Sequence, residues 1–365
     1  MRVNFRRARG TANTEAVLAA ALRRDGRTLH GAAGPSGDVT CYSLNIGNAR
    51  PLLAELAGAG CVTVAGGPYA SACPAEVARV ADWVVVGEGE GTLARVLDAV
   101  ETGTGDPVPG TATAAHGVVP VDHAVRLDAY PPFLRRKGYI ECSRGCPNAC
   151  AFCQTPRLFP GGMRHRSIDA CVEAARALPD ARFVTPNAFA YGSDGRRPRL
   201  EKVRRLLAAL AREGGRTWFG TFPSEVRPEF VTDAALELVG EFCANDRVHF
   251  GIQSASDRVL GLIGRGHTVA DGLEAVDRVL DHGFVPVVDL IVGFPFEADD
   301  EQEETVALAE RLAGRGCRVH AHRFTPLPGT PLAGVPARPV LASSRRRLGR
   351  LALDGRLTGS FSGLG

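Results

Sequence analysis

Short apolar runs alternate with amphipathic segments along the N-terminal part of the chain. The apolar runs predict strands, and the segments with apolar residues on one face predict helices. We expect strands at residues 3–5, 28–30, 38–43, 61–65 and 82–86, and helices at residues 15–23, 49–57, 74–81 and 92–100. Because strands that alternate with helices form a parallel sheet covered on both faces, the pattern predicts a small α/β domain over residues 1–103.

A second strand–helix series follows residues 104–137, a stretch rich in turn-forming Gly and Pro that predicts a linker. We expect strands at residues 137–145, 182–185, 217–222, 248–252, 285–292 and 318–324, and helices at residues 167–178, 200–212, 232–242, 269–282 and 299–314. This series fits a partial (β/α)6 barrel over residues 138–332, with its chemistry at the carboxyl ends of the strands. An Arg-rich amphipathic segment at residues 340–356 predicts a helical tail over residues 333–365.

Composition narrows the class of protein. The chain has 365 residues, of which 45% are hydrophobic, which suits a globular protein of two domains. A net charge of +3 argues against a nucleic-acid partner. No apolar run reaches the length of a membrane span, and the N-terminus lacks the apolar core of an export signal. Ten cysteines without such a signal predict thiols or metal ligands in a reducing cytoplasm.

The clearest chemical signal is a group of cysteines at close spacing, Cys146, Cys150 and Cys153. Three thiolates can hold three irons of a 4Fe-4S cluster and leave the fourth iron without a protein ligand. Zinc is an alternative, although zinc sites usually pair two close ligands with two distant ones. Cys142 lies four residues before Cys146, so Cys142, Cys146 and Cys150 form a second possible set. The two-residue gap before Cys153 and the aromatic Phe152 favour the first set.

This spacing, with an aromatic residue before the last cysteine, resembles the signature of the radical S-adenosylmethionine (SAM) superfamily. The resemblance implies a partial barrel, a 4Fe-4S cluster on Cys146, Cys150 and Cys153, and cleavage of SAM to a 5′-deoxyadenosyl radical. It further implies that Arg265 pairs with the SAM carboxylate, with an ion pair on a helix surface as the alternative. The resemblance also implies that Gln253 and Ser254 lie beside the ribose of SAM. It implies that Phe152, Ile291 and Gly293 lie beside the adenine.

One family feature is absent, because Pro186-Asn187-Ala188 stands where a Gly-Gly-Glu motif usually follows the second strand. For catalysis, Tyr191 is a candidate on position alone. Glu225 and Arg227 are candidates for substrate contact, with an ordinary loop salt bridge as the alternative. The alternating residues His320 and His322 face one side of the sixth strand, either into the pocket or outward beneath a helix.

The first domain resembles the cobalamin-binding domain that is fused to many radical SAM enzymes. The resemblance rests on residues at the expected strand ends, and it implies a cofactor site at Ser43, Asn45, Gly66, Gly67, Gly87, Glu88, Gly89 and Glu90. No Asp-x-His-x-x-Gly motif occurs, since Asp25 and His30 are too far apart, so we expect no histidine below the cobalt. His116 and His123 are possible cobalt or substrate ligands or solvated loop residues. The alternative is a degenerate sheet used for docking.

The whole chain therefore resembles radical SAM proteins with an N-terminal cobalamin-binding domain. By analogy, we expect methylation of an unactivated carbon in a small-molecule or peptide substrate, with flavodoxin or ferredoxin as electron donor. A first alternative is a radical enzyme without cobalamin, such as a methylthiotransferase or a rearrangement enzyme. A methylthiotransferase usually has further cluster cysteines near its N-terminus, and Cys41, Cys61 and Cys73 are not close in sequence. A second alternative is a non-enzymatic iron–sulfur sensor.

Overall fold

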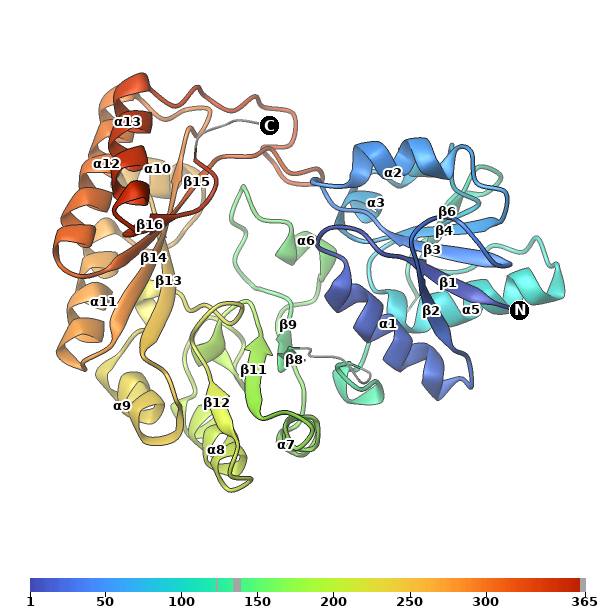
Figure 1. The fold of residues 1–365 in the computed structure, drawn as a ribbon, viewed down its shortest axis with the longest axis horizontal. Helices are drawn as coiled ribbons and strands as arrows, with labels where there is room; N and C mark the ends of the chain where they lie inside the picture. Colours follow the sequence, from blue (N-terminus) through green and yellow to red (C-terminus); the bar gives the residue numbers. More distant parts are fainter. Residues whose placement is uncertain (123, 134–138, 362–365) are drawn as a thin grey trace. The chain divides into compact units, whose positions relative to one another are not determined.

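The computed structural model describes residues 1–122, 124–133 and 139–361, which form two compact units (Figure 1). The first unit contains Met1–Ile140 and Arg157–Pro160, and the second contains Glu141–Pro156 and Gly161–Gly365. His123 and the first residues of the strand expected at 137–145 lie outside the described residues. Within the described part of the chain, no helix is long and apolar enough to cross a membrane.

The first unit is built on one sheet with the strand order β2-β1-β3-β4-β5-β6-β7. The strands are β1 Val3–Arg6, β2 Leu29–Ala32, β3 Val39–Ser43, β4 Val62–Gly66, β5 Trp83–Val85, β6 Thr111–Thr113 and β7 Gly117–Val118. Strands β1 to β5 are parallel, whereas β6 and β7 are antiparallel additions beside β5. The parallel sheet expected from the sequence is confirmed.

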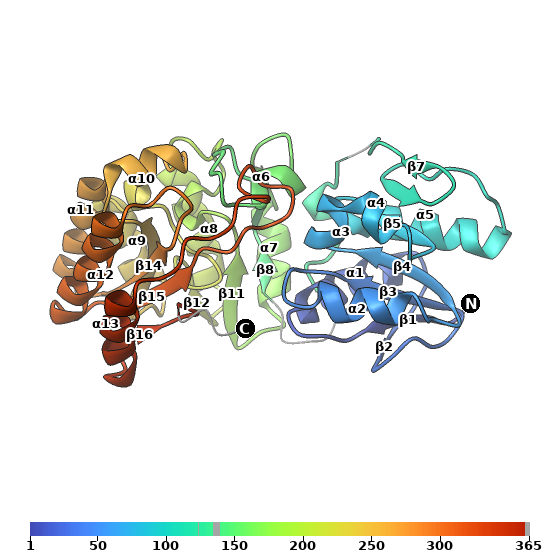
Figure 2. The same ribbon diagram turned by 90° about the horizontal axis from the view of Figure 1, so that it is seen from above.

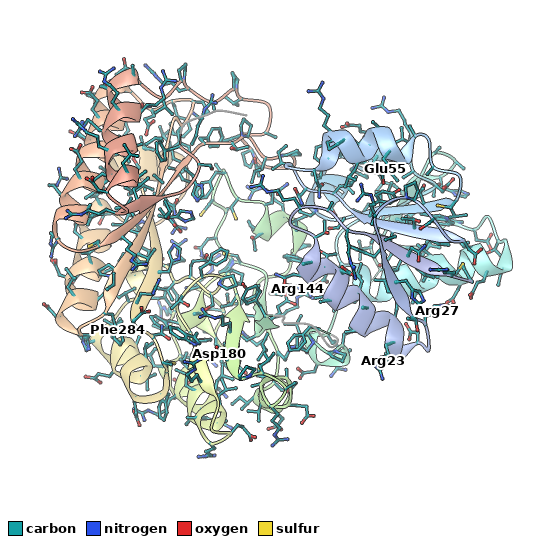
Figure 3. The ribbon with its side chains drawn as sticks, viewed as in Figure 1. Arg23, Arg27, Glu55, Arg144, Asp180 and Phe284 are labelled. Carbon is teal, nitrogen blue, oxygen red and sulfur yellow. The ribbon has the colours of Figure 1, made fainter. Side chains whose placement is uncertain are left out.

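Helices cover both faces of this sheet because neighbouring strand residues point to opposite sides. The helices are α1 Ala12–Arg24, α2 Ala49–Leu56, α3 Pro68–Ala72, α4 Pro74–Val77 and α5 Gly89–Thr102. One apolar cluster joins Val39, Cys41 and Val64 to α1 and α5, and the other joins Tyr42 and Ala65 to α2, α3 and α4. On α2, Glu55 forms an ion pair with Arg6 of β1 at 2.7 Å (Figure 3).

Residues 111–118 differ from the expectation of a simple linker, because they form β6 and β7 at the edge of the sheet. Thr111 and Ala112 are fully buried, and they pair with Val85 and Val84 of β5. Without β6, β5 would be an exposed sheet edge with unpaired backbone groups. Before the second unit, η1 Leu127–Ala129 forms a short 3-10 turn.

The second unit contains two main groups of strands. The first has the order β12-β11-β8 and the second the order β13-β14-β15-β16, while β9 Ser143–Arg144 pairs with β10 Arg164–His165. The remaining strands are β8 Ile140–Glu141, β11 Asp180–Val184, β12 Arg216–Trp218, β13 Arg247–Gln253, β14 Val285–Val292, β15 Arg318–Arg323 and β16 Leu357–Thr358. A parallel bridge between Val226 and Phe250 links the segment after β12 to β13.

Helices lie along the outer side of these strands, as Figures 1 and 2 show for α11, α12 and α13 beside β13 to β15. The helices are α6 Thr155–Leu158, α7 Ile168–Ala175, α8 Leu200–Ala211, α9 Asp233–Phe242, α10 Asp257–Leu262, α11 Val269–Asp281, α12 Asp299–Gly314 and α13 Ala342–Leu353, with 3-10 turns η2 Ala188–Ala190 and η3 Pro228–Phe230. The expected order of strands and helices is confirmed. Strand β16, which follows α13 and pairs with β15, was not expected from the sequence.

Burial alternates along β14 and identifies the inner face of the curved sheet. Val288, Leu290 and Val292 are buried beneath the helices, whereas Asp289 and Ile291 are only partly buried. The same alternation on β15 buries Val319 and Ala321. His320 and His322 therefore face inward, which decides between the two orientations that the sequence left open.

Candidate functional site

The cysteine loop follows β9 and is attached to the end of α10. The backbone N–H of Ala151 donates to the carbonyl of Ile263 at 2.9 Å, and Cys150 Sγ lies 3.7 Å from the carbonyl oxygen of Gly264. Asn148 donates a side-chain hydrogen bond to Cys146 Sγ at 3.5 Å. Before the loop, Arg144 forms an ion pair with Glu141 at 2.6 Å (Figure 3). These contacts hold the loop in a defined conformation at the end of the strand.

The three predicted cluster ligands lie close enough to influence one another. Burial raises the pKa of the Cys153 thiol, and negative charge on Cys150 and Cys146 raises that pKa further. Cys150 is buried, whereas Cys146 and Cys153 are partly exposed. Such an electrostatic coupling is the arrangement that a shared metal centre would relieve, because thiolates bind the metal and the metal neutralises their charge. The thiols therefore fit a 4Fe-4S cluster.

Cys142 has a different environment. It is fully buried, and burial raises the pKa of its thiol to about 12. Its Sγ atom lies 3.9 Å from the carbonyl oxygen of Val184 on β11 and 3.9 Å from Ser143 Oγ. A buried thiol with a raised pKa is a poor source of thiolate. The structure therefore favours Cys142 as a packing residue at a strand end.

Arg265 lies directly beside the cysteine loop. Its Nη1 atom is 3.8 Å from Cys150 Sγ, and its Nη2 atom donates to the carbonyl of Gly251 at 2.9 Å. The side chain is 9% exposed, and its Nε–H has no hydrogen-bond partner among the described residues. A buried guanidinium group with a free donor suits an incoming carboxylate. The alternative of a surface ion pair is wrong, because Arg265 is buried.

Arg227 holds the backbone of Arg265 in place. Its guanidinium group donates to the carbonyl of Arg265 and pairs with Glu229, while only 5% of the residue is exposed. This arrangement matches the loop salt bridge that the sequence left as the alternative to a substrate contact. Arg227 is therefore better described as a positioning residue than as a catalytic one.

Gln253 ends β13 in a strained conformation. Its φ of 78° is the only positive value at a residue other than glycine within the described ranges. Its side chain folds back over Gly251, where Gln253 Nε2 lies only 1.8 Å from the position that a Cβ atom would take. Left-handed backbone at a non-glycine residue costs on the order of 1–3 kcal/mol and often marks functional sites. The placement agrees with a cofactor contact for Gln253.

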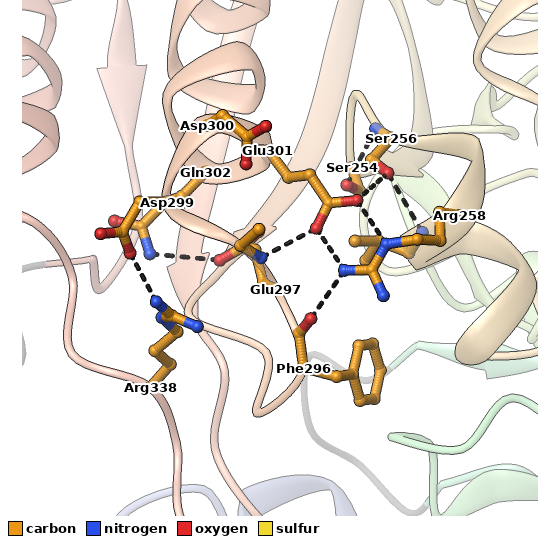
Figure 4. Close-up of polar contacts among 12 residues, drawn as sticks. Ser254, Ser256, Arg258, Phe296, Glu297, Asp299, Asp300, Glu301, Gln302 and Arg338 are labelled. Atoms are coloured by element: carbon orange, nitrogen blue, oxygen red, sulfur yellow. Dashed lines mark hydrogen bonds and ion pairs between the residues drawn. The ribbon is translucent and has the colours of Figure 1, made fainter.

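Ser254 does not fit the same role. It is fully buried, and its hydroxyl interacts with Thr305 of α12 at 3.4 Å and accepts the N–H of Ser256 at 3.1 Å. Glu301 completes this network by accepting from Ser256 and pairing with Arg258 (Figure 4). The Ser254 side chain thus fixes the loop before α10, and the predicted ribose contact by this hydroxyl is not supported.

Glu297 is a site residue that the sequence interpretation missed. It is fully buried after β14, and one carboxylate oxygen accepts the N–H of Gly293 at 2.6 Å and a side-chain N–H of Gln302 at 3.2 Å. Burial raises the pKa of Glu297 to about 7. The spacing Gly293-x-x-x-Glu297 after an apolar strand was the available signal. Glu297 holds the turn at the end of β14 in place.

Of the three residues predicted to contact the adenine, Ile291 and Phe152 remain candidates and Gly293 does not. The carbonyl of Gly293 accepts the N–H of Arg338, so both backbone groups of Gly293 have partners within the protein. A backbone contact from Gly293 is therefore not supported. Ile291 faces the inside of the sheet and remains available. Phe152 packs on Phe294 with ring centroids 6.0 Å apart, next to the cysteine loop.

Asn187 occupies the position of the missing Gly-Gly-Glu motif. It is 2% exposed, and neither polar atom of its carboxamide has a hydrogen-bond partner in the described part of the chain. Burying an amide without partners costs roughly 1–3 kcal/mol, so a buried amide normally has a hydrogen-bond partner. For Asn187 the described residues do not supply one. The ammonium group of a bound ligand would donate a hydrogen bond to the carboxamide oxygen of Asn187.

Tyr191 is not placed as a hydrogen donor to substrate. It is 4% exposed, its hydroxyl donates to the carbonyl of Arg166 at 2.7 Å, and its ring meets His165 edge-on. Glu225 is better placed, because it lies near His249, Asp289 and His320 inside the curved sheet, where burial raises the pKa of its carboxyl. Glu225 is therefore the stronger of the proposed catalytic candidates.

In the first unit, the predicted cobalamin residues lie at the carboxyl ends of adjacent parallel strands. Ser43 of β3 is paired with Gly66 of β4, and Gly87 follows β5. Asn45 is partly exposed and accepts the N–H of Gly47. A Cβ atom on Gly67 would lie 2.8 Å from the carbonyl oxygen of Leu44, so internal packing already requires this glycine. Ser43 is buried, whereas Gly66 and Gly87 are partly exposed at strand ends, where a flat ligand would approach the backbone.

The carboxylates and histidines of this unit fit a cofactor contact less well. Glu88 accepts the N–H of Val125 at 3.0 Å, and Glu90 is buried, so neither side chain reaches outward from the sheet edge. His116 lies in the turn between β6 and β7, next to the amino end of β5 and opposite the glycine-rich edge. His30 is exposed on the edge strand β2. Among the described residues, His30 and His116 therefore lie away from the glycine-rich strand ends, and the absence of a histidine below a cobalt ion stays a prediction.

Comparison with known proteins gives a matching family profile and several relatives of this chain. The Radical SAM superfamily profile matches residues 140–309. The tRNA-2-methylthio-N(6)-dimethylallyladenosine synthases of Pelobacter propionicus and Halorhodospira halophila are each 30% identical, over 249 and 302 residues. These matches cover 65% and 78% of this chain, and 55% and 61% of those proteins. The chain thus spans little more than half the length of these curated relatives.

Solved structures share the fold of both units. The radical S-adenosylmethionine methyltransferase TsrM from Kitasatospora setae, with cobalamin and a [4Fe-4S] cluster bound, gives a TM-score of 0.71 at 15% identity over 91% of this chain and 73% of that chain. The cobalamin-dependent S-adenosylmethionine radical enzyme OxsB, with aqua-cobalamin and S-adenosylmethionine bound, gives a TM-score of 0.66 at 15% identity over 87% of this chain and 52% of that chain. At this identity, the likeness concerns the fold.

The cysteine loop lies near the start of the matched region, and Arg265, Gln253 and Glu297 lie within it. The family implies a 4Fe-4S cluster and SAM as cofactors, and the clustered thiols and the buried guanidinium beside them fit these groups. Taken together, the cysteine motif, the site geometry and the profile match place residues 140–309 of this chain in the Radical SAM superfamily.

Proposed function

We propose that this protein is a cobalamin-dependent radical SAM methyltransferase that methylates an unactivated carbon of a small-molecule or peptide substrate. The observation that supports the proposal is the N-terminal parallel sheet, in which the glycines Gly66 and Gly87, both partly exposed, lie at the carboxyl ends of adjacent strands and suit a flat cofactor. TsrM and OxsB, which have this combination of folds, are described with cobalamin bound. A flavodoxin or ferredoxin is the proposed electron donor.

The residues of the second unit have separate tasks in this proposal. When bound, the cluster supplies the electron that cleaves SAM, and cobalamin supplies the methyl group. Cys146, Cys150 and Cys153 hold the cluster, and Arg265 orients the SAM carboxylate with its unpaired Nε–H. Asn187 offers its carboxamide oxygen to the SAM ammonium group. Glu225 is the candidate for substrate contact inside the curved sheet, where burial raises the pKa of its carboxyl.

A methylthiotransferase is the second candidate, because the curated relatives at 30% identity are tRNA methylthio-modifying enzymes. This activity would require a second cluster. Cys41 is buried, and burial raises the pKa of its thiol to about 12, while Cys61 contacts Thr40. These environments favour the methyltransferase.

Anaerobic reconstitution with iron and sulfide, followed by hydroxocobalamin and removal of free cofactor, separates the two candidates. The methyltransferase predicts about four irons and one retained cobalamin per chain. About eight irons without cobalamin would support the methylthiotransferase instead. With dithionite and SAM, both candidates predict 5′-deoxyadenosine, and its absence from a protein with an intact cluster would contradict both.

A further inference from the structure

A second group of metal-binding side chains lies inside the curved sheet of the second unit. His249, Asp289 and His320 belong to the adjacent strands β13, β14 and β15. Asp289 Oδ1 is 2.8 Å from His249 Nε2 and 3.2 Å from His320 Nδ1. The three possible ligand atoms all lie within 4.8 Å of one another. The role assigned to the cysteine loop does not involve these residues.

Strand register explains why these residues meet. Asp289 is paired with Gly251 on one side and with His320 on the other, and His249 lies two residues before Gly251 on the same face. Because side chains on one face alternate with a period of two, His249, Asp289 and His320 all project inward. Gly251 has no side chain, and the carboxamide of Gln253 occupies the position that a Cβ atom of residue 251 would take.

The chemistry of the three donors is that of a transition-metal site. Two imidazole nitrogens and one carboxylate oxygen bind Zn²⁺, and they form the facial triad of non-haem Fe²⁺ sites. Ligands that lie about 2.0–2.2 Å from a common ion are about 2.8–3.6 Å from each other in tetrahedral or octahedral geometry. The two distances from Asp289 Oδ1, 2.8 and 3.2 Å, fall within this range.

A cavity of about 410 Å³ gives access to this group. His249 and His320 line it, together with Thr221, Phe222, Trp218 and Arg182. A catalytic metal keeps one coordination position open for water or substrate, and a cavity of this kind provides the room for it. The aromatic and cationic lining would suit an organic molecule with an oxygen or nitrogen donor.

We propose that His249, Asp289 and His320 bind one divalent transition-metal ion, Zn²⁺ or Fe²⁺, with an open coordination position toward this cavity. The ion would hold an oxygen or nitrogen atom of a small molecule there. His322 provides a matched control, because it lies on the same face of β15 with its ring centroid 4.3 Å from that of His320. Its Nδ1 atom is 3.2 Å from Ser360 Oγ, and it is not one of the three ligands.

The test uses the full chain with Cys146, Cys150 and Cys153 replaced by Ala, so that zinc cannot bind at the cysteine loop. After chelator treatment, zinc titration and gel filtration, elemental analysis should find about one zinc per chain. His249→Gln, Asp289→Asn and His320→Gln should each lower zinc affinity by about 100-fold or more, since even outer partners of a metal are worth about 10–100-fold. His322→Gln should leave the affinity unchanged.

A cobalt spectrum and the intact protein provide independent checks. Co²⁺ in the variant that lacks Cys146, Cys150 and Cys153 should give visible bands without thiolate charge transfer, and Asp289→Asn should abolish them. In the reconstituted protein with its cluster, Asp289→Asn should lose zinc while retaining its iron, which separates metal loss from unfolding. The proposal is overturned if neither protein takes up zinc, or if uptake is the same in the ligand variants and in His322→Gln.

Discussion

Arg265 Nη1 lies 3.8 Å from Cys150 Sγ, although the two residues are 115 positions apart in the chain. The contact joins the cysteine loop to the segment between α10 and α11. Cys150 Sγ also lies 3.7 Å from the carbonyl oxygen of Gly264, the residue before Arg265. A cofactor that binds at the cysteine loop would therefore meet a buried positive charge, which is the arrangement that an anionic ligand requires.

Replacing the cluster cysteines should separate Cys142 from the other three. Cys146→Ala, Cys150→Ala and Cys153→Ala should each lose the cluster, because three thiolates are needed to hold it. Cys142→Ala should retain it, since that thiol is buried against β11. Iron content and visible absorption after anaerobic reconstitution measure the outcome. Loss of the cluster in Cys142→Ala with retention in Cys153→Ala would show that the ligand set is wrong.

Arg265→Ala should keep its cluster but bind SAM weakly. Loss of a charge-assisted contact costs on the order of 2–3 kcal/mol, which is roughly a factor of 30–150 in affinity. Calorimetry on the reconstituted protein measures this change. Arg204, which is exposed on α8 and pairs with Glu241, is the matched control, and Arg204→Ala should bind normally. Equal affinity in both variants would exclude Arg265 from the SAM site.

Asn187→Ala should reduce SAM affinity without reducing stability. Its carboxamide has no partner among the residues described, so removal relieves a buried polar group rather than breaking a hydrogen bond. We expect roughly a 13-fold to 150-fold loss of affinity, corresponding to about 1.5–3 kcal/mol for one hydrogen bond to a charged group. Thermal unfolding of the unliganded protein is the second measurement. A variant that unfolds earlier but binds SAM normally would give Asn187 a purely structural role.

Gly66→Leu should prevent cobalamin retention while preserving the fold. Gly66 has no left-handed backbone, and a Cβ atom there would lie 3.5 Å from Val85 Cβ, an ordinary contact. A longer side chain would then extend past the strand end and occupy the proposed corrin position. Retention of hydroxocobalamin after gel filtration measures the effect, with circular dichroism as the folding control. Undiminished retention would move the cofactor away from this sheet edge.

The cobalt(II) electron paramagnetic resonance spectrum tests whether a histidine binds below the cobalt. We expect no nitrogen splitting, because His30 is exposed on the edge strand and His116 lies at the opposite edge of the sheet. His30→Ala should leave the spectrum unchanged. A three-line nitrogen pattern that disappears in His30→Ala would contradict this expectation.

Glu297 should give the protein a pH-dependent stability. Burial raises its pKa from the usual 4.5 to about 7, so the folded protein keeps a proton that the unfolded chain releases within this window. The free energy of unfolding should therefore fall as the pH rises from 4.5 to 7, by on the order of 3 kcal/mol from this group. Denaturant unfolding of Glu297→Gln should show a smaller slope. An identical pH profile in the variant would assign the dependence to other groups.

The sequence by itself determined the features that depend on local spacing. Apolar alternation located the strands and helices of both units, and the expected bounds of α12 and β14 agree with residues 299–314 and 285–292 of the structure. The cysteine spacing and Phe152 indicated the cluster because these ligands lie on one short loop. Local patterns are reliable here because neighbouring residues along a strand or helix have fixed relative directions.

Only the tertiary structure decided which distant residues meet. Strand register brings His249, Asp289 and His320 together, and it turns His320 and His322 inward. Contacts with Val184 and Ser143 distinguish Cys142 from the cluster cysteines, and the hydroxyls of Ser254 and Tyr191 have partners within the protein. Strands β6 and β16 were missed because they are short and form beside an existing edge. Such pairings depend on long-range hydrogen bonding and packing, which no local pattern records.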